Sequence, residues 1–282
     1  MRWQLLGKYF SNERKGGLIM IEHRIAFPFI YLMLIISFIM GTSHVWASQD
    51  TASLGQLQEQ ANQGDADAQF KLGFIYESGQ GVKQDYMEAG KWYLKAANQG
   101  HARAQHNLGI LYSAGRGLPL NYDEAMKWYR KAATQGIAEA QYNIGAMYSQ
   151  GLGVPVDYEE SMKWYLRAAE QGDARAQYNI GIMYRSGQGV PVNYAEAMRW
   201  YRKAANQGNP DAQYNVGAMY ANGRGVEKDL VKAYMWLSLS ASKAEGTLFD
   251  QVRFGLDRLI QRMSTEEIAK AKRLVQEWKS TK

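Results

Sequence analysis

The sequence predicts an all-α protein, an α-α superhelix (solenoid) of five 36-residue helix-turn-helix repeats with helical caps. Three observations predict this fold class. Residue types return at a constant step of 36 along the 282 residues, and each step holds two stretches in which apolar residues have helical spacing. Glycines separate the two stretches in every step.

The repeat is visible at single positions that recur every 36 residues, and each set of such positions is here called a column. The segment AQYNIGAMYSQGLGV at 140–154 returns as AQYNIGIMYRSGQGV at 176–190. The resulting units are 65–100, 101–136, 137–172, 173–208 and 209–244. Glycine and tryptophan hold two fixed columns, for which we expect structural roles: Gly73, Gly109, Gly145, Gly181 and Gly217, and Trp92, Trp128, Trp164, Trp200 and Trp236.

Each unit predicts two short helices, as the third unit shows. Four apolar residues share one face of its first helix: Ala140, Ile144, Met147 and Tyr148. Gly151 and Gly153 end that helix, because glycine accepts the left-handed conformation of a helix C-terminus. The second helix begins at Asp157, and Glu160 three residues later predicts a capping box.

Both ends of the repeat array predict capping helices. Residues 51–64 are similar to the end of a second helix, because Ala-Asn-Gln-Gly at 61–64 also stands at 97–100. Residues 247–282 contain two further stretches with helical spacing. Such caps are expected, because one repeat cannot bury its apolar faces without a neighbour.

The N-terminus predicts an exported protein. Residues 25–40 carry no charge, follow a basic flank and lead to small residues that end at Ala47. This pattern predicts a signal peptide over residues 1–47 that is cleaved after Ala47. The alternative is an uncleaved membrane anchor, although a spanning helix requires about 20 apolar residues.

The start of translation is a separate hypothesis. Lys15-Gly16-Gly17 can be encoded by a ribosome-binding sequence, which would make Met20 the true start and leave residues 1–19 untranslated. In either case we expect a mature chain from near Ser48 that is periplasmic or secreted and no longer contacts a membrane. The alternative is a protein anchored in the inner membrane.

Charge and composition exclude several classes of function. The net charge of +6 is concentrated at the two ends, since residues 48–246 carry 20 basic and 20 acidic side chains. A neutral body argues against nucleic acid as a partner. The absence of cysteine excludes a disulfide framework, a thiolate zinc site and a cysteine nucleophile.

No catalytic, metal or cofactor site is predicted. The expected mature chain has two histidines, His101 and His106, whose spacing of five places them on different faces of a helix. We therefore expect incidental surface histidines, no cofactor and no enzyme. A hydrolase is kept only as the least favoured reading, because no group of residues forms a catalytic constellation.

The repeated pattern A-x-A-Q-x-x-[LIV]-G-x-x-Y-x-x-G-x-G-V, then D/N-Y…A…W-Y…A-A…G, resembles the Sel-one-like repeat (SLR) family. The resemblance covers residues 65–244 and extends to the tetratricopeptide repeat. It implies a right-handed superhelix that serves as a protein-binding scaffold. Exported bacterial members look like adaptors in signalling, envelope or polysaccharide assembly and host contact.

A cysteine-rich branch with reported β-lactamase-like or penicillin-binding activity is excluded by the absence of cysteine. The fifth unit departs from the pattern at Leu237 and Ser240.

The resemblance also implies a binding face. Fixed columns build the stack, so the varied columns of the first helices should select the partner on a concave face. The candidate partner-binding residues are Asn107, Asn143, Asn179, Asn215, Tyr142, Tyr178, Tyr214, Arg103, Arg175 and Arg185. The four asparagines of this list, here called the asparagine ladder, can form hydrogen bonds with the backbone of an extended peptide. The open alternative is that these asparagines bond within or between the units. The loop residues Arg116, Leu152, Gln188 and Arg224 form a second candidate surface.

These inferences predict a non-enzymatic scaffold, in the bacterial envelope or secreted, that binds a partner protein or peptide on its concave face. The alternative is an adaptor for peptidoglycan or polysaccharide machinery, with cell-wall or polysaccharide enzymes as partners, that also contacts glycan.

Overall fold

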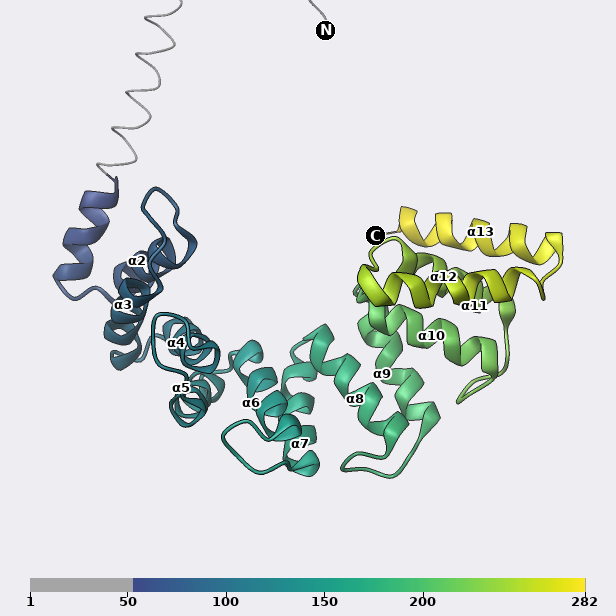
Figure 1. Cartoon of the computed structure of the whole chain (residues 1–282), viewed down its shortest axis with the longest axis horizontal. Coiled ribbons are helices and arrows are strands. Elements are labelled where there is room, and N and C mark those ends of the chain that lie inside the picture. The colour runs from purple at the N-terminus through teal and green to yellow at the C-terminus, as the bar shows by residue number, and fades with distance from the viewer. Residues whose placement is uncertain (1–52, 282) are drawn as a thin grey trace, which may run out of the picture. The chain divides into compact units, whose positions relative to one another are not determined.

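The computed structural model describes residues 53–281 (Figure 1). The expected signal peptide, its cleavage point and the alternative anchor lie outside the described residues. A compact unit begins at Leu57. All regular elements within residues 53–281 are helices, which confirms the all-α class. None of the described helices is long and apolar enough to cross a membrane.

Five pairs of helices build the repeats, each consisting of a first helix (helix A) and a second helix (helix B). The A helices are α2 (Ala66–Ser78), α4 (Ala102–Ala114), α6 (Ala138–Gln150), α8 (Ala174–Ser186) and α10 (Pro210–Asn222). The B helices are α3 (Tyr86–Asn98), α5 (Tyr122–Thr134), α7 (Tyr158–Glu170), α9 (Tyr194–Asn206) and α11 (Leu230–Ala241). Each B helix packs on its own A helix and, as far as α9, on the next A helix, which confirms the solenoid (Figure 1).

Helices also stand at both ends of the array. Residues 53–62 are helical and precede α2. Two further helices, α12 (Gly246–Ile260) and α13 (Thr265–Ser280), both pack on α11. The rings of Trp236 and Trp278 meet edge to face with centroids 6.2 Å apart, which joins α13 to the last repeat.

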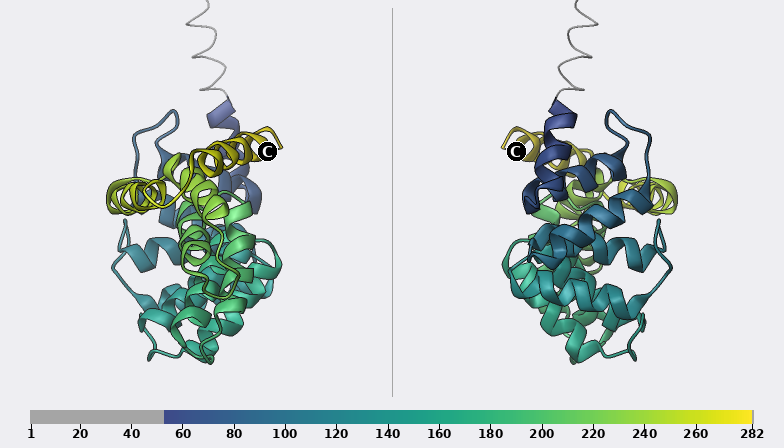
Figure 2. Two further views of the ribbon diagram at one scale, coloured as in Figure 1. Left: turned by 90° about the vertical axis from the view of Figure 1, so that its right-hand side faces the viewer. Right: turned by 90° about the vertical axis from the view of Figure 1, so that its left-hand side faces the viewer.

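The Gly-x-Gly of each A–B loop serves two different purposes. Gly151 adopts a φ of 71° and its N–H bonds to the Met147 carbonyl, so the first glycine ends helix A. A Cβ on the second, Gly153, would lie 2.5 Å from Cβ of Tyr122 in the preceding repeat. The second glycine therefore lets the loop contact the preceding B helix, and these loops lie along one edge of the array (Figure 2).

The expected capping box of the B helices is wrong. Asp157 accepts the Glu160 N–H at 2.9 Å, as an N-cap should, but its own N–H donates to the Tyr148 carbonyl at 3.0 Å. Because the loop already uses that N–H, the Glu160 carboxylate instead accepts from Lys163 and from the Trp164 indole. A reciprocal capping box forms only in α13 among the described helices, between Ser264 and Glu267.

Tryptophan and alanine form the cores between repeats. The five column tryptophans are between 4% and 9% exposed. Trp164 of α7 packs in one cluster with Ala132 of α5 and Ile144 of α6, so its side chain joins three helices from two repeats. Burying large rings against alanines brings neighbouring backbones close together, which stabilises the stack.

In the first four repeats, a tyrosine of helix B explains the glycine inside helix A. A Cβ on Gly181 would lie 2.5 Å from Cδ1 of Tyr201, and Gly145 meets Tyr165 in the same way at 2.7 Å. Tyr201 is fully buried. Glycine stands at this column because the tyrosine ring occupies the space of its side chain.

Candidate partner-binding face of the A helices

A column of rings runs along the A helices and, in the first four repeats, rests on the B-helix tyrosines. Its members are half-buried: Phe70, His106, Tyr142, Tyr178 and Tyr214. Tyr142 lies 5.6 Å from Tyr165, and Tyr178 lies 5.7 Å from Tyr201, measured between ring centroids. Each of these rings packs one face against its own repeat and leaves part of its surface exposed.

The B-helix tyrosines each face a polar residue from helix A in the first three repeats. Glu77 accepts from the Tyr93 hydroxyl, and Ser113 bonds to the Tyr129 hydroxyl at 2.9 Å. Burial raises the pKa of Tyr129 to about 12, so this phenol stays protonated. In the fifth repeat the pair becomes Ala221 and Leu237, and both polar groups are lost together. The repeat pattern contained this tyrosine and its loss at Leu237, but it did not predict the polar partner from helix A.

The asparagine ladder makes hydrogen bonds between repeats. Asn107 donates to the Tyr93 hydroxyl at 3.0 Å, and Asn143 lies 3.2 Å from Nε2 of His106. Asn215 accepts from Arg185 at 3.2 Å and donates to the backbone of its own helix. The bonds to Tyr93, His106 and Arg185 each link an asparagine to the preceding repeat, and the backbone bond of Asn215 stays within its own; hydrogen bonds within or between the units are the alternative that the sequence left open.

Asn179 takes part in a similar contact. Burial raises the pKa of the Tyr165 hydroxyl, while hydrogen bonds from Ser149 and Asn179 act in the opposite direction. Asn179 therefore faces a tyrosine of the preceding repeat.

Two of the three candidate arginines are held by neighbours. Arg175 binds both oxygens of Asp173 and lies 4.2 Å above the Tyr142 ring. Arg185 is held by Asn215. Arg103 is exposed and makes no ion pair within residues 53–281, which leaves its charge free for a partner.

The expectation that the histidines are incidental surface residues is wrong. His101 is the N-cap of α4, and its Nδ1 accepts the Ala104 N–H at 3.1 Å. His106 belongs to the ring column, and burial lowers its pKa while the nearby Glu139 opposes the shift. Each histidine stands in a column with a structural role. Asp173, in the column of His101, also caps its helix, α8, and Tyr142 follows His106 in the ring column.

A glutamine lattice ties the ends of neighbouring helices together and was also missed. Gln105 is buried; it donates to the Ala97 carbonyl at 3.1 Å and accepts from Gln135 at 2.8 Å. The lattice stops at the fifth repeat, where Lys243 stands in the column of Gln135 and the buried Gln213 Oε1 has no partner among the described residues. No group of three or more His, Asp or Glu residues in residues 53–281 is placed to hold a metal ion.

The comparisons with known proteins agree with this geometry. The model of the Sel1 repeat matches residues 66–101, 102–137, 138–173, 174–209 and 210–244. No curated protein matches the chain.

Two solved structures are similar to this one. The first is c5321, described as a protective antigen of uropathogenic Escherichia coli strains with an SLR fold. It shares 33% identity over 80% of this chain and 48% of its own, with a TM-score of 0.73. The chain thus spans about half of its length. The second is a Sel1 repeat protein from Oxalobacter formigenes, with 37% identity over 76% of this chain and 88% of its own and a TM-score of 0.67. The chain belongs to the Sel1 repeat family.

Proposed function

We propose that this chain is a non-enzymatic scaffold that binds a partner protein or an extended peptide on the face formed by its A helices. Sel1 repeat proteins generally mediate protein–protein interactions. The observation that carries the proposal is the column of five half-buried rings, which leaves part of one ring exposed at the same place in every repeat. Aromatic side chains of this kind anchor many protein interfaces.

Charges beside the rings supply a basis for selectivity. The neighbouring column alternates in sign along the array: Asp67, Arg103, Glu139, Arg175 and Asp211. Complementary charges on a partner would set its register and exclude partners with the wrong order. Arg103 contributes most in this proposal, because Arg175 is already paired with Asp173.

The asparagine ladder supports the side chains that would contact the partner. Asn143 fixes His106, and Asn215 fixes Arg185, so the ladder holds the binding side chains in place. The remaining amide capacity of Asn107, Asn143 and Asn179 is available to a peptide backbone.

The test begins with peptides selected from a random display library on the chain, with affinities measured by fluorescence polarisation. Arg103→Ala and Tyr178→Ala should each weaken binding of the selected peptides by about tenfold, the loss of one interface anchor. Lys127→Ala is the matched control, since Lys127 is exposed on helix B, forms an ion pair with Glu124 of the same helix and lies over the Trp128 ring. Equal losses for all three variants would contradict the proposal.

Two outcomes distinguish the alternatives. Saturable binding of soluble peptidoglycan or polysaccharide fragments, with competition by the selected peptides, would favour the adaptor of glycan machinery. Turnover of ester or β-lactam substrates would favour a hydrolase.

The export of the chain is a further part of the proposal, and it rests on the sequence alone. The expected product begins near Ser48 and appears in the periplasmic or extracellular fraction, which N-terminal mass spectrometry of each fraction can test. A full-length product that remains with the inner membrane after a carbonate wash would favour the anchor.

A further inference from the structure

Each A–B loop contacts the preceding B helix at the same position of the repeat, and this contact surface is here called the seat. Leu118 of the second loop lies over Gly90 of α3, since a Cβ on that glycine would be 3.3 Å from the Leu118 side chain. The corresponding loop residues Val154, Val190 and Val226 also pack against the buried clusters of their neighbours. Four residues further along the B helix, at the next helical turn, Arg130 of α5 donates to the Tyr148 hydroxyl of the following A helix at 2.7 Å. Each B helix thus offers a surface that the next repeat covers.

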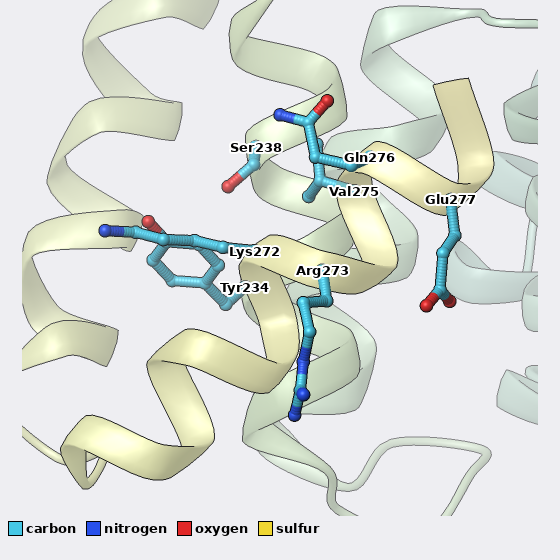
Figure 3. Close-up of a pocket in the computed structure, with 7 residues that line it drawn as sticks. All are labelled: Tyr234, Ser238, Lys272, Arg273, Val275, Gln276 and Glu277. Atoms are coloured by element: carbon cyan, nitrogen blue, oxygen red, sulfur yellow. The ribbon is translucent and has the colours of Figure 1, made fainter. Parts of the chain in front are cut away.

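The last B helix, α11, also has residues in the columns of Gly90 and Arg130, but no further A–B loop follows it to contact them. Tyr234 of α11 stands in the column of Gly90, and Ser238 stands in the column of Arg130. The chain continues instead as α12 and α13. Both residues line an open pocket of about 480 Å³ between α11 and α13 (Figure 3). The other lining residues come from α13: Lys272, Arg273, Val275, Gln276 and Glu277.

The charge around this pocket is positive. Lys272 and Arg273 are exposed and make no ion pair within the described part of the chain. Residues 247–282 carry eight basic and five acidic side chains, whereas residues 48–246 are balanced. The excess positive charge of the expected mature chain therefore belongs to its C-terminal end.

We propose that this pocket is a second docking site, which binds an apolar turn of an acidic partner protein in place of the missing A–B loop. Two arguments select this occupant. The pocket continues an interface that four loops of the chain already form with apolar residues, so a turn carrying valine or leucine fits its surface. The unpaired cations at its rim favour acidic residues beside that turn. A contact the size of one loop is smaller than the roughly 1,200 Å² of a stable interface, so binding through it alone is weak.

The absence of cysteine allows a direct test by disulfide tethering. Ser238→Cys places the only thiol of the expected mature chain in the pocket. The probes are head-to-tail cyclic peptides with the loop sequence Gly-Leu-Gly-Val-Pro-Val followed by Asp, and versions with Val→Ser or Asp→Lys. Each carries one added cysteine as a mixed disulfide with cysteamine, so the protein thiol takes the peptide sulfur and releases cysteamine. Arg202→Cys is the matched control, because position 202 stands in the same column of α9 and is itself exposed, whereas Met198, which stands in the column of Tyr234, is already buried there.

We expect Ser238→Cys to retain the apolar acidic peptide at reductant concentrations about tenfold above those that release it from Arg202→Cys. Both changed peptides should be retained less. Adding Lys272→Glu and Arg273→Glu should reverse the preference between Asp and Lys, and a melt of each variant verifies that it folds. Equal retention by the two thiols, or no preference among the peptides, would overturn the proposal. Both outcomes are independent of binding on the A-helix face.

Discussion

At the scale of single residues, we expect His106 to make the stability of the stack depend on pH. Its Nε2 can accept from Asn143 only when the ring is neutral, and burial lowers its pKa below the ordinary 6.5. As the pH falls through 6.5 toward the lower folded pKa, the unfolded chain binds a proton that the folded chain does not. The stabilising contribution is therefore complete above pH 6.5 and is lost below it.

We expect the melting temperature to fall on going from about pH 7.5 to about pH 5.5, and His106→Tyr to reduce that fall. Tyrosine is a fair replacement, since it stands in the same column as Tyr142 and Tyr178. Calorimetric melts of both proteins across this range are the measurement. The charges facing His106 are Glu139 and Arg175, which act in opposite directions. An identical pH dependence in the two proteins would remove His106 as its source.

A second residue-scale prediction concerns the ladder. Asn143→Ala removes the hydrogen bond to His106 and should cost about 0.5–1.5 kcal/mol of unfolding free energy, the usual range for one such bond. Arg103→Ala is the control and should change stability by less than about 0.5 kcal/mol, because its side chain is exposed. Denaturant melts compare the two. A cost at Asn143 no larger than at Arg103 would mean that the ladder does not brace the stack.

The sequence could place these residues on a column but could not say what each one contacts. The 36-residue step identified the asparagines and the rings, because repetition is visible without a structure. The partner of Asn143 is His106, which lies in another repeat, and that relation depends on how the repeats are rotated against each other. The same holds for the cap role of His101, which replaces the aspartate found at Asp65 and Asp173.

At the scale of helices, the glycine inside helix A and the tyrosine of helix B form one unit. Gly181→Ala should destabilise the protein by about 1–3 kcal/mol through overpacking, although alanine favours helix by about 1 kcal/mol. Gly217→Ala is the matched control, since a Cβ there would meet the more flexible Leu237 at 2.9 Å and the Ala233 carbonyl at 3.1 Å rather than a tyrosine ring. Adding Tyr201→Leu to Gly181→Ala should recover part of the loss. Urea melts of the four proteins would contradict this pairing if the two alanine variants were equal.

The capping box shows where sequence signals for a helix end are incomplete. An aspartate followed by a glutamate three residues later predicts two reciprocal bonds, and only the bond from the aspartate side chain forms at Asp157. The backbone N–H that the glutamate would need is bonded to Tyr148 of the preceding helix. Helix existence was therefore predictable from local residues, whereas the role of Glu160 required knowledge of the loop geometry.

At the scale of the whole array, the sequence was sufficient to predict the fold class because each repeat contacts chiefly its neighbours. A constant step, two amphipathic stretches and a glycine stop determine the local pair, and stacking copies of that pair gives the solenoid. The C-terminal end was harder to predict. Nothing in residues 247–282 says that α12 and α13 both pack on α11 and leave the pocket beside Tyr234 open.

The same dependence on neighbours predicts how damage spreads along the array. Trp164 packs against Ala132 and Ile144 and belongs to the middle repeat, so Trp164→Ala should cost about 3–5 kcal/mol, the range for truncating a buried large aromatic. Because stability is transmitted only between adjacent repeats, a weak centre should separate the melting of the two halves. Trp236→Ala weakens the terminal contact with Trp278 and should loosen one end while the remaining repeats melt together. Circular dichroism melts combined with hydrogen exchange of individual repeats distinguish the two variants. A single, unbroken transition for Trp164→Ala with uniform exchange along the chain would mean that the repeats are coupled over longer distances than one interface.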